Sequence, residues 1–87
     1  MNFIIKLLIM EEGFVLSNKF RKVVFNELIT SDANARDISK KHHIPLSAVE
    51  RAIKDLEGAG LIKEDKDRYT LTKEGEKLAE KLKRQMI

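Results

Sequence analysis

The chain has 87 residues, of which 43% are hydrophobic and 36% are charged, and its formal net charge is +3 at pH 7. This balance favours one small folded domain over a disordered chain, and the charge excess is too small to identify a partner by itself. The absence of cysteine excludes disulfides, thiolate catalysis and cysteine-based zinc sites, and it fits a cytoplasmic protein.

The chain begins with an apolar run, MNFIIKLLI, which only Lys6 interrupts. It is far shorter than the roughly 20 residues of a membrane span, and it lacks the basic start and small-residue cleavage site of a secretory signal. Three interpretations stay open: a cover for the domain's own core, a contact with a second subunit, or a disordered or non-native extension with Met10 as the true start. We therefore separate an N-terminal segment, residues 1–16, from a folded domain, residues 17–87.

The first predicted helix follows Ser17 or Asn18, either of which can cap it, and runs to about Thr30. Its apolar side chains recur at helical spacing, and Glu27 is the one charged residue in that stripe. The stripe is wide enough to be buried on two sides; its apolar members are Phe20, Val23, Val24, Phe25, Leu28 and Ile29. A polar turn follows, and a very short strand is expected at residues 33–35.

Two further helices are predicted around Pro45, which cannot continue a helix because it lacks a backbone donor and restrains Ile44. The first covers residues 36–42, and Ile44 packs as an apolar plug between the two. Ser47 and Glu50 have the spacing of a capping box at the start of the second helix. Its inward face carries Val49, Ala52, Ile53 and Leu56, and its outward face carries Ser47, Arg51 and Lys54.

A hairpin and a closing helix complete the predicted fold. One of Gly58 and Gly60 is expected to end the preceding helix in a left-handed conformation. Residues 61–64 and 68–71 are strand-like and flank a three-residue loop, and Tyr69 is expected to pack across the hairpin. Thr72 caps the closing helix, whose apolar side carries Leu78, Ala79, Leu82 and Met86. That helix is too short and irregular for a sustained coiled coil.

This order of elements resembles the winged helix-turn-helix family, in particular small MarR-like prokaryotic and archaeal transcription regulators. The resemblance is carried by Ile38, Ile44, the run SAVERAIKDLEGAGLI at 47–62 and the run RYTLTKEG at 68–75, and it covers about residues 17–83. It implies a mainly α fold with a small β-hairpin wing, built as a three-helix core plus a C-terminal helix. Where the family's turn often has glycine, this chain has His43, which tolerates positive φ better than most residues.

The resemblance also implies a function: sequence-specific binding of double-stranded DNA by a homodimeric transcription regulator. The recognition helix, residues 47–57, would lie in the major groove and the wing, residues 61–72, beside it. Arg51 is the best candidate for base readout, because a guanidinium can bind guanine through two acceptors. The other implied DNA-binding residues are Ser47, Ala48 and Lys54 on the recognition helix, Arg36, Lys40 and Lys41 on the preceding helix, and Lys63, Lys66 and Arg68 on the wing.

The distribution of charge keeps a second function open. Residues 17–46 hold six bases and three acids, whereas the recognition helix has a net charge of −1 and the wing is neutral. A winged helix that serves protein–protein assembly, without direct DNA binding, fits the same pattern.

Catalysis and metal binding are not indicated. The Ser, His and Asp residues form no recognisable nucleophile–base–orienter set, and no glycine-rich phosphate loop is present. His42 and His43 are adjacent, so they cannot share one helix face as a ligand pair. We expect no enzyme activity, no cofactor and no membrane association; the sequence does not indicate an effector ligand or an operator.

Overall fold

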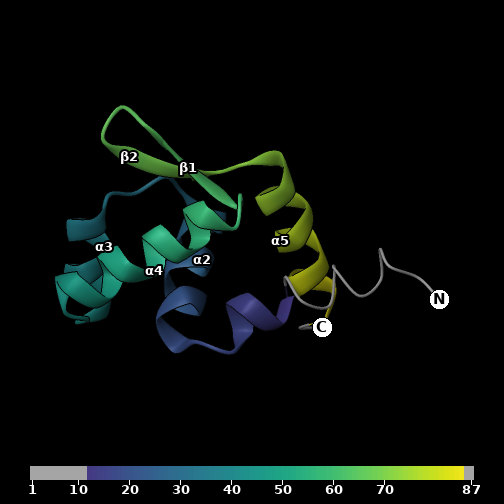
Figure 1. The fold of residues 1–87 in the computed structure, drawn as a ribbon, viewed down its shortest axis with the longest axis horizontal. Helices are drawn as coiled ribbons and strands as arrows, with labels where there is room; N and C mark the ends of the chain where they lie inside the picture. The colour runs from purple at the N-terminus through teal and green to yellow at the C-terminus, as the bar shows by residue number, and fades with distance from the viewer. Residues whose placement is uncertain (1–11, 86–87) are drawn as a thin grey trace.

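The computed structural model describes residues 12–85, apart from the side chain of Gln85. A short helix at residues 12–16 is followed by six named elements: α2 (Lys19–Thr30), α3 (Ala35–His42), α4 (Leu46–Gly58), β1 (Ile62–Asp65), β2 (Arg68–Leu71) and α5 (Lys73–Gln85). The hairpin projects from one side of the helices, and α3 and α5 lie at opposite ends of the molecule (Figure 1). The predicted fold class, mainly helical with a β-hairpin and a C-terminal helix, is confirmed.

Helix α2 lies at the centre of the fold and packs against α3, α4 and β2. Asn18 caps it as predicted, since its Oδ1 accepts hydrogen bonds from the backbone N–H groups of Phe20 (2.9 Å) and Arg21 (3.1 Å). The wide apolar face is confirmed by the burial of Val24, Phe25 and Leu28. These side chains hold the other helices around α2.

The N-terminal segment contributes to this core through residues 12–16. Val15 is fully buried in the core cluster, and Phe14 packs against it. The apolar run at residues 1–9, for which three interpretations were open, lies outside the described residues. So does Met86, which was expected on the apolar side of α5.

The predicted capping box at the start of α4 is wrong. The N-cap residue is Pro45, no side chain caps the helix, and Pro45 has an extended backbone with φ −55° and ψ 137°. Its carbonyl accepts hydrogen bonds from the N–H groups of Ala48 (3.0 Å) and Val49 (3.2 Å). Because the helix already begins at Leu46, Ser47 lies inside the first turn, where its hydroxyl cannot take the capping position.

The hairpin differs from the prediction by one residue. β1 and β2 are antiparallel, with Ile62 opposite Leu71 and Asp65 opposite Arg68. Asp65 therefore belongs to the strand, and the expected three-residue loop is a two-residue turn. Its residues, Lys66 and Asp67, both have positive φ (51° and 66°), as a type I′ turn requires to match the twist of its strands.

Tyr69 ties the hairpin to the start of α3. Its backbone N–H donates to the carbonyl of Ala33 (2.8 Å), and its carbonyl accepts from the N–H of Ala33 (3.3 Å). The short strand expected at residues 33–35 is thus reduced to a single antiparallel bridge at Ala33.

The start of α5 is held against the end of α4. Gly60, with φ +78°, is the left-handed glycine expected after α4. The Thr72 hydroxyl donates to the carbonyl of Gly60 (2.7 Å) and accepts from the N–H of Gly75 (3.1 Å), so the predicted cap is confirmed. A Cβ at Gly75 would overlap the carbonyl of Leu61, which explains why this position on α5 has no side chain.

Candidate nucleic-acid interface

Helix α4 divides into a buried and an exposed side, as the sequence predicts. Val49, Ala52, Ile53 and Leu56 are buried in the core. Ser47, Arg51 and Lys54 are exposed, and Ala48 is half-buried. At about 100° per residue, Ser47, Arg51 and Lys54 project most directly away from the core. We call these three residues the outward strip of α4; it holds two bases and no acid.

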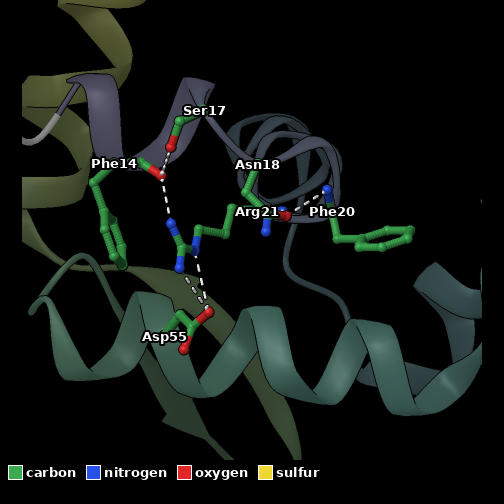
Figure 2. A network of polar contacts seen from close by, with 6 residues as sticks. All are labelled: Phe14, Ser17, Asn18, Phe20, Arg21 and Asp55. Carbon is green, nitrogen blue, oxygen red and sulfur yellow. Dashed lines mark hydrogen bonds and ion pairs between the residues drawn. The ribbon is translucent and has the colours of Figure 1, made fainter.

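Asp55, an acid beside this strip, is neutralised by Arg21 of α2. Nε and Nη2 of Arg21 both lie 3.1 Å from Oδ2 of Asp55. Nη1 of Arg21 donates to the carbonyl of Phe14 (3.0 Å), and the guanidinium carbon lies 4.0 Å from the centre of the Phe14 ring. Figure 2 shows Arg21 between the helix at residues 12–16 and α4. One arginine thus joins three elements and compensates an acid of α4.

The opposite flank of α4 is acidic. Glu50 and Glu57 line a shallow pocket with Tyr69, together with Ala35, Ile53 and Lys54. Burial raises the pKa of the Tyr69 hydroxyl, and the nearby carboxylates of Glu64, Glu57 and Glu50 raise it further. Within residues 12–85 Glu50 and Glu57 form no ion pair, so this flank keeps its negative charge, and Lys54 lies at its edge.

The basic residues of α3 fall into two groups. Lys41 is paired with Glu27 of α2, its Nζ lying 3.0 Å from Oε2, and Nε2 of His42 lies 2.9 Å from the other carboxylate oxygen. Arg36 and Lys40 are exposed and make no ion pair within residues 12–85. Of the predicted DNA-binding residues on α3, Arg36 and Lys40 are therefore the two whose charge is not compensated by an ion pair within residues 12–85.

On the wing, Lys63, Lys66 and Arg68 are all exposed. Nη2 of Arg68 donates to the backbone carbonyl of Asp32 (2.9 Å), so this guanidinium braces the hairpin against the α2–α3 turn. Lys63 and Lys66 form no ion pair with any other residue that the structure describes. The predicted site residues of the wing thus share one hairpin but differ in their contacts.

The turn between α3 and α4 fixes the relative position of the two helices. His43 takes the left-handed conformation (φ 54°, ψ 47°) in which glycine is common. The Ser39 hydroxyl donates to the carbonyl of Ile44 (2.6 Å), and the N–H of Ile44 donates to the carbonyl of Ser39 (3.1 Å). Ile44 is partly buried and packs against the core, which agrees with the inward position expected for it.

Arg21 and the partners of Glu27 are not among the residues predicted from the sequence. An acid within an otherwise apolar stripe was a usable signal for Glu27, because a half-buried carboxylate needs hydrogen-bond donors. No comparable signal existed for Arg21, since Asp55 is 34 residues away in the sequence and nothing in a linear pattern pairs them.

Comparison with known proteins agrees with this architecture. The winged helix-turn-helix family model matches residues 23–86, which is most of the chain and includes all of α3, α4 and the hairpin. The chain belongs to the winged helix-turn-helix family. No curated protein sequence matches it.

Three solved structures show the same winged helix fold over nearly the whole chain. One is the solution NMR structure of the homodimeric winged helix-turn-helix DNA-binding domain Mb0332 from Mycobacterium bovis, a possible ArsR-family transcriptional regulator. It has a TM-score of 0.68 and 16% identity, with 94% of this chain and 80% of that chain covered. Reduced HlyU from Vibrio cholerae has a TM-score of 0.68 and 21% identity, with coverage of 91% and 85%.

The third similar structure is part of a larger protein. It is CalO1, a methyltransferase in calicheamicin biosynthesis, with a TM-score of 0.52 and 16% identity. The match covers 90% of this chain but 26% of CalO1. At these identities the three likenesses establish the fold alone.

Residues 12–85 show no feature of a membrane span or a metal site. None of the helices there has the length and apolar character needed to span a bilayer. The same stretch contains no group of three or more His, Cys, Asp or Glu side chains placed to hold a metal ion.

Proposed function

We propose that the protein binds specific sites on double-stranded DNA and acts as a cytoplasmic, non-enzymatic transcription regulator. The observation that carries this proposal is the outward strip of α4: Ser47, Arg51 and Lys54 are exposed together, and Asp55, the acid one turn beyond Arg51, is paired with Arg21. A recognition helix needs donors free to reach base edges, and Arg51 suits the two acceptors of guanine. In this arrangement α4 enters the major groove and the hairpin lies beside it.

Phosphate contacts are expected from the free cations around this strip. Arg36 and Lys40 on α3 and Lys63 and Lys66 on the wing are exposed and have no ion-pair partner within residues 12–85. Such side chains position a protein on the duplex without reading sequence. Lys41 is paired with Glu27, and Arg68 donates to the carbonyl of Asp32. Each must give up that contact to bind a phosphate, so each contributes less to DNA affinity than a free cation.

We further propose that the active form is a homodimer. Leu16 is the large apolar side chain left exposed within residues 12–85, at 45%, and it follows the apolar run of residues 1–9. The similar domain Mb0332 is homodimeric. A two-fold dimer would place two α4 helices roughly 34 Å apart, on successive major grooves of one DNA face. Light scattering tests this: a monomer at concentrations far above those of DNA binding contradicts it.

A second function is favoured by the acidic flank of α4. Glu50, Glu57 and Glu64 surround Tyr69, and the wing as a whole is neutral. A protein–protein assembly module without direct DNA binding would expose such a surface to a basic partner.

The salt dependence of DNA binding separates the two functions. The full chain is titrated against mixed genomic DNA fragments at several salt concentrations. Contacts with about four to six phosphates per subunit predict a steep fall of log K with log salt, with a slope near −0.9 per phosphate. No binding at low salt, or a flat profile, contradicts the DNA proposal and favours the assembly module.

A further inference from the structure

Arg51 and Asp55 lie one turn apart on α4, at the spacing of an intrahelical ion pair. They nevertheless do not pair. Within residues 12–85, the Arg51 side chain makes no hydrogen bond or ion pair, whereas Asp55 accepts from both Nε and Nη2 of Arg21 at 3.1 Å. All three side chains line one groove between α2 and α4. An arginine from another helix thus holds the carboxylate that lies within one turn of Arg51.

The contacts of Arg21 explain why Asp55 pairs with Arg21 and not with Arg51. Its guanidinium is fixed by the Phe14 carbonyl at 3.0 Å and by the face of the Phe14 ring at 4.0 Å. Its side chain is only 21% exposed, so most of its freedom is already lost on folding. Arg51 is exposed and would lose side-chain freedom on pairing with Asp55. A helical pair at this spacing is also weaker when the base precedes the acid, as Arg51 precedes Asp55.

We propose that Arg21 is a positioning residue for DNA recognition that masks Asp55 and thereby keeps Arg51 free. The inference rests on the proposed function of α4 as the reading helix. With Arg21 in place, the Arg51 guanidinium extends to the DNA and the charge of the Asp55 carboxylate is compensated. Without Arg21, Asp55 becomes available to Arg51 and repels the duplex. Both effects depend on the carboxylate of Asp55, so removing that charge must reverse both.

The masking is tested first in the free protein, without DNA. NMR follows proton exchange at Nε of Arg51 in the wild type, in Arg21→Ala and in the double variant Arg21→Ala/Asp55→Asn. Exchange of the Nε proton of Arg51 should be fast in the wild type. It should be slower in Arg21→Ala, because this N–H can then donate a hydrogen bond to Asp55, and fast again in the double variant. Equal exchange at Arg51 in all three proteins overturns the proposal.

DNA affinity supplies the second readout. Arg21→Ala should weaken binding to a preferred site by on the order of fivefold, the range of one partly exposed charge interaction. Adding Asp55→Asn should restore affinity to within about twofold of the wild type. If Arg21 served only to pack α2 against α4, the double variant would bind as weakly as the single one, and the proposal would be wrong.

Two controls make these outcomes specific. Lys22→Ala removes an exposed charge of α2 with no contact to Asp55, so Asp55→Asn should not compensate for it. Arg21→Met keeps an unbranched stem against Phe14 and replaces Arg21→Ala if the smaller side chain prevents folding. If the wild type fails to bind DNA, the proposed function falls, while the NMR exchange still decides whether Arg21 masks Asp55.

Discussion

The Glu27 carboxylate of α2 accepts a hydrogen bond from Nε2 of His42 at 2.9 Å, so the single charge in the apolar stripe of α2 holds the last turn of α3. Lys41 binds the second oxygen at 3.0 Å, and the Glu27 side chain is only 11% exposed. The hydrogen bond from His42, followed by that from Lys41, lowers the pKa of Glu27 below its ordinary value of 4.5. The charged form of Glu27 is therefore favoured by folding.

We predict that Glu27→Gln lowers the free energy of unfolding by about 1 kcal/mol at neutral pH, since it removes charge-assisted hydrogen bonds from a side chain with exposed partners. Because the pKa of Glu27 is lower in the folded state, its contribution is complete above 4.5 and disappears as the pH falls through the folded-state pKa. Urea denaturation at pH 7 and pH 3 should show a difference from the wild type that shrinks in acid. Glu80→Gln, at an exposed position of α5, is the matched control; a pH-independent loss in Glu27→Gln contradicts the prediction.

Gly75→Ala should destabilise the protein by roughly 1–3 kcal/mol, the usual cost of inserting a methyl group into a closely packed site. The new Cβ would overlap the backbone carbonyl of Leu61, which cannot rotate away as a side chain could. Gly58→Ala is the comparison, because a Cβ at Gly58 meets nothing within 4 Å and alanine favours the helix by about 0.5–1 kcal/mol. Chemical denaturation of both variants should give changes of opposite sign; equal effects would refute the close approach at Gly75.

His43 holds a left-handed conformation, with φ 54°, and two substitutions should therefore have opposite effects. His43→Gly should stabilise the fold by about 0.5–1 kcal/mol, because glycine adopts this conformation without steric cost. His43→Val should destabilise it by roughly 1–2 kcal/mol, since a β-branched side chain is strained there. Thermal denaturation measures both, and a valine variant as stable as the wild type would rule out this geometry for the turn.

Arg51→Ala and Lys40→Ala should differ in what they do to DNA recognition. Loss of Arg51 should cost roughly 1–3 kcal/mol at the preferred site and reduce discrimination between sites, as expected for a base-reading guanidinium. Loss of Lys40 should weaken all sequences alike and make the salt slope shallower by about one. The affinity of each variant for one preferred site and several altered sites checks both expectations. Unchanged specificity in Arg51→Ala would mean that another surface contacts the bases.

Local sequence signals determined most of the fold. Asn18, Pro45, Gly60 and Thr72 mark where elements begin or end through effects that act within a few residues, and each boundary lies where the structure has it to within a residue or two. Two of the differences from the prediction, at the start of α4 and in the hairpin turn, are also local. Pro45 serves as the N-cap in place of Ser47, and Asp65 joins its strand, because backbone geometry overrode side-chain preference at both positions.

The outward face of α4 was also determined by the sequence alone, because the spacing of its apolar residues fixes which side chains point away from the core. Whether those side chains are free was decided by the tertiary structure. Arg21 of α2 pairs with Asp55 of α4, next to that face. Among the other predicted DNA-binding residues, Lys41 is paired with Glu27, and Arg68 donates to the carbonyl of Asp32. Ion pairs between distant segments depend on how helices pack, and periodicity within one helix carries no information about that packing.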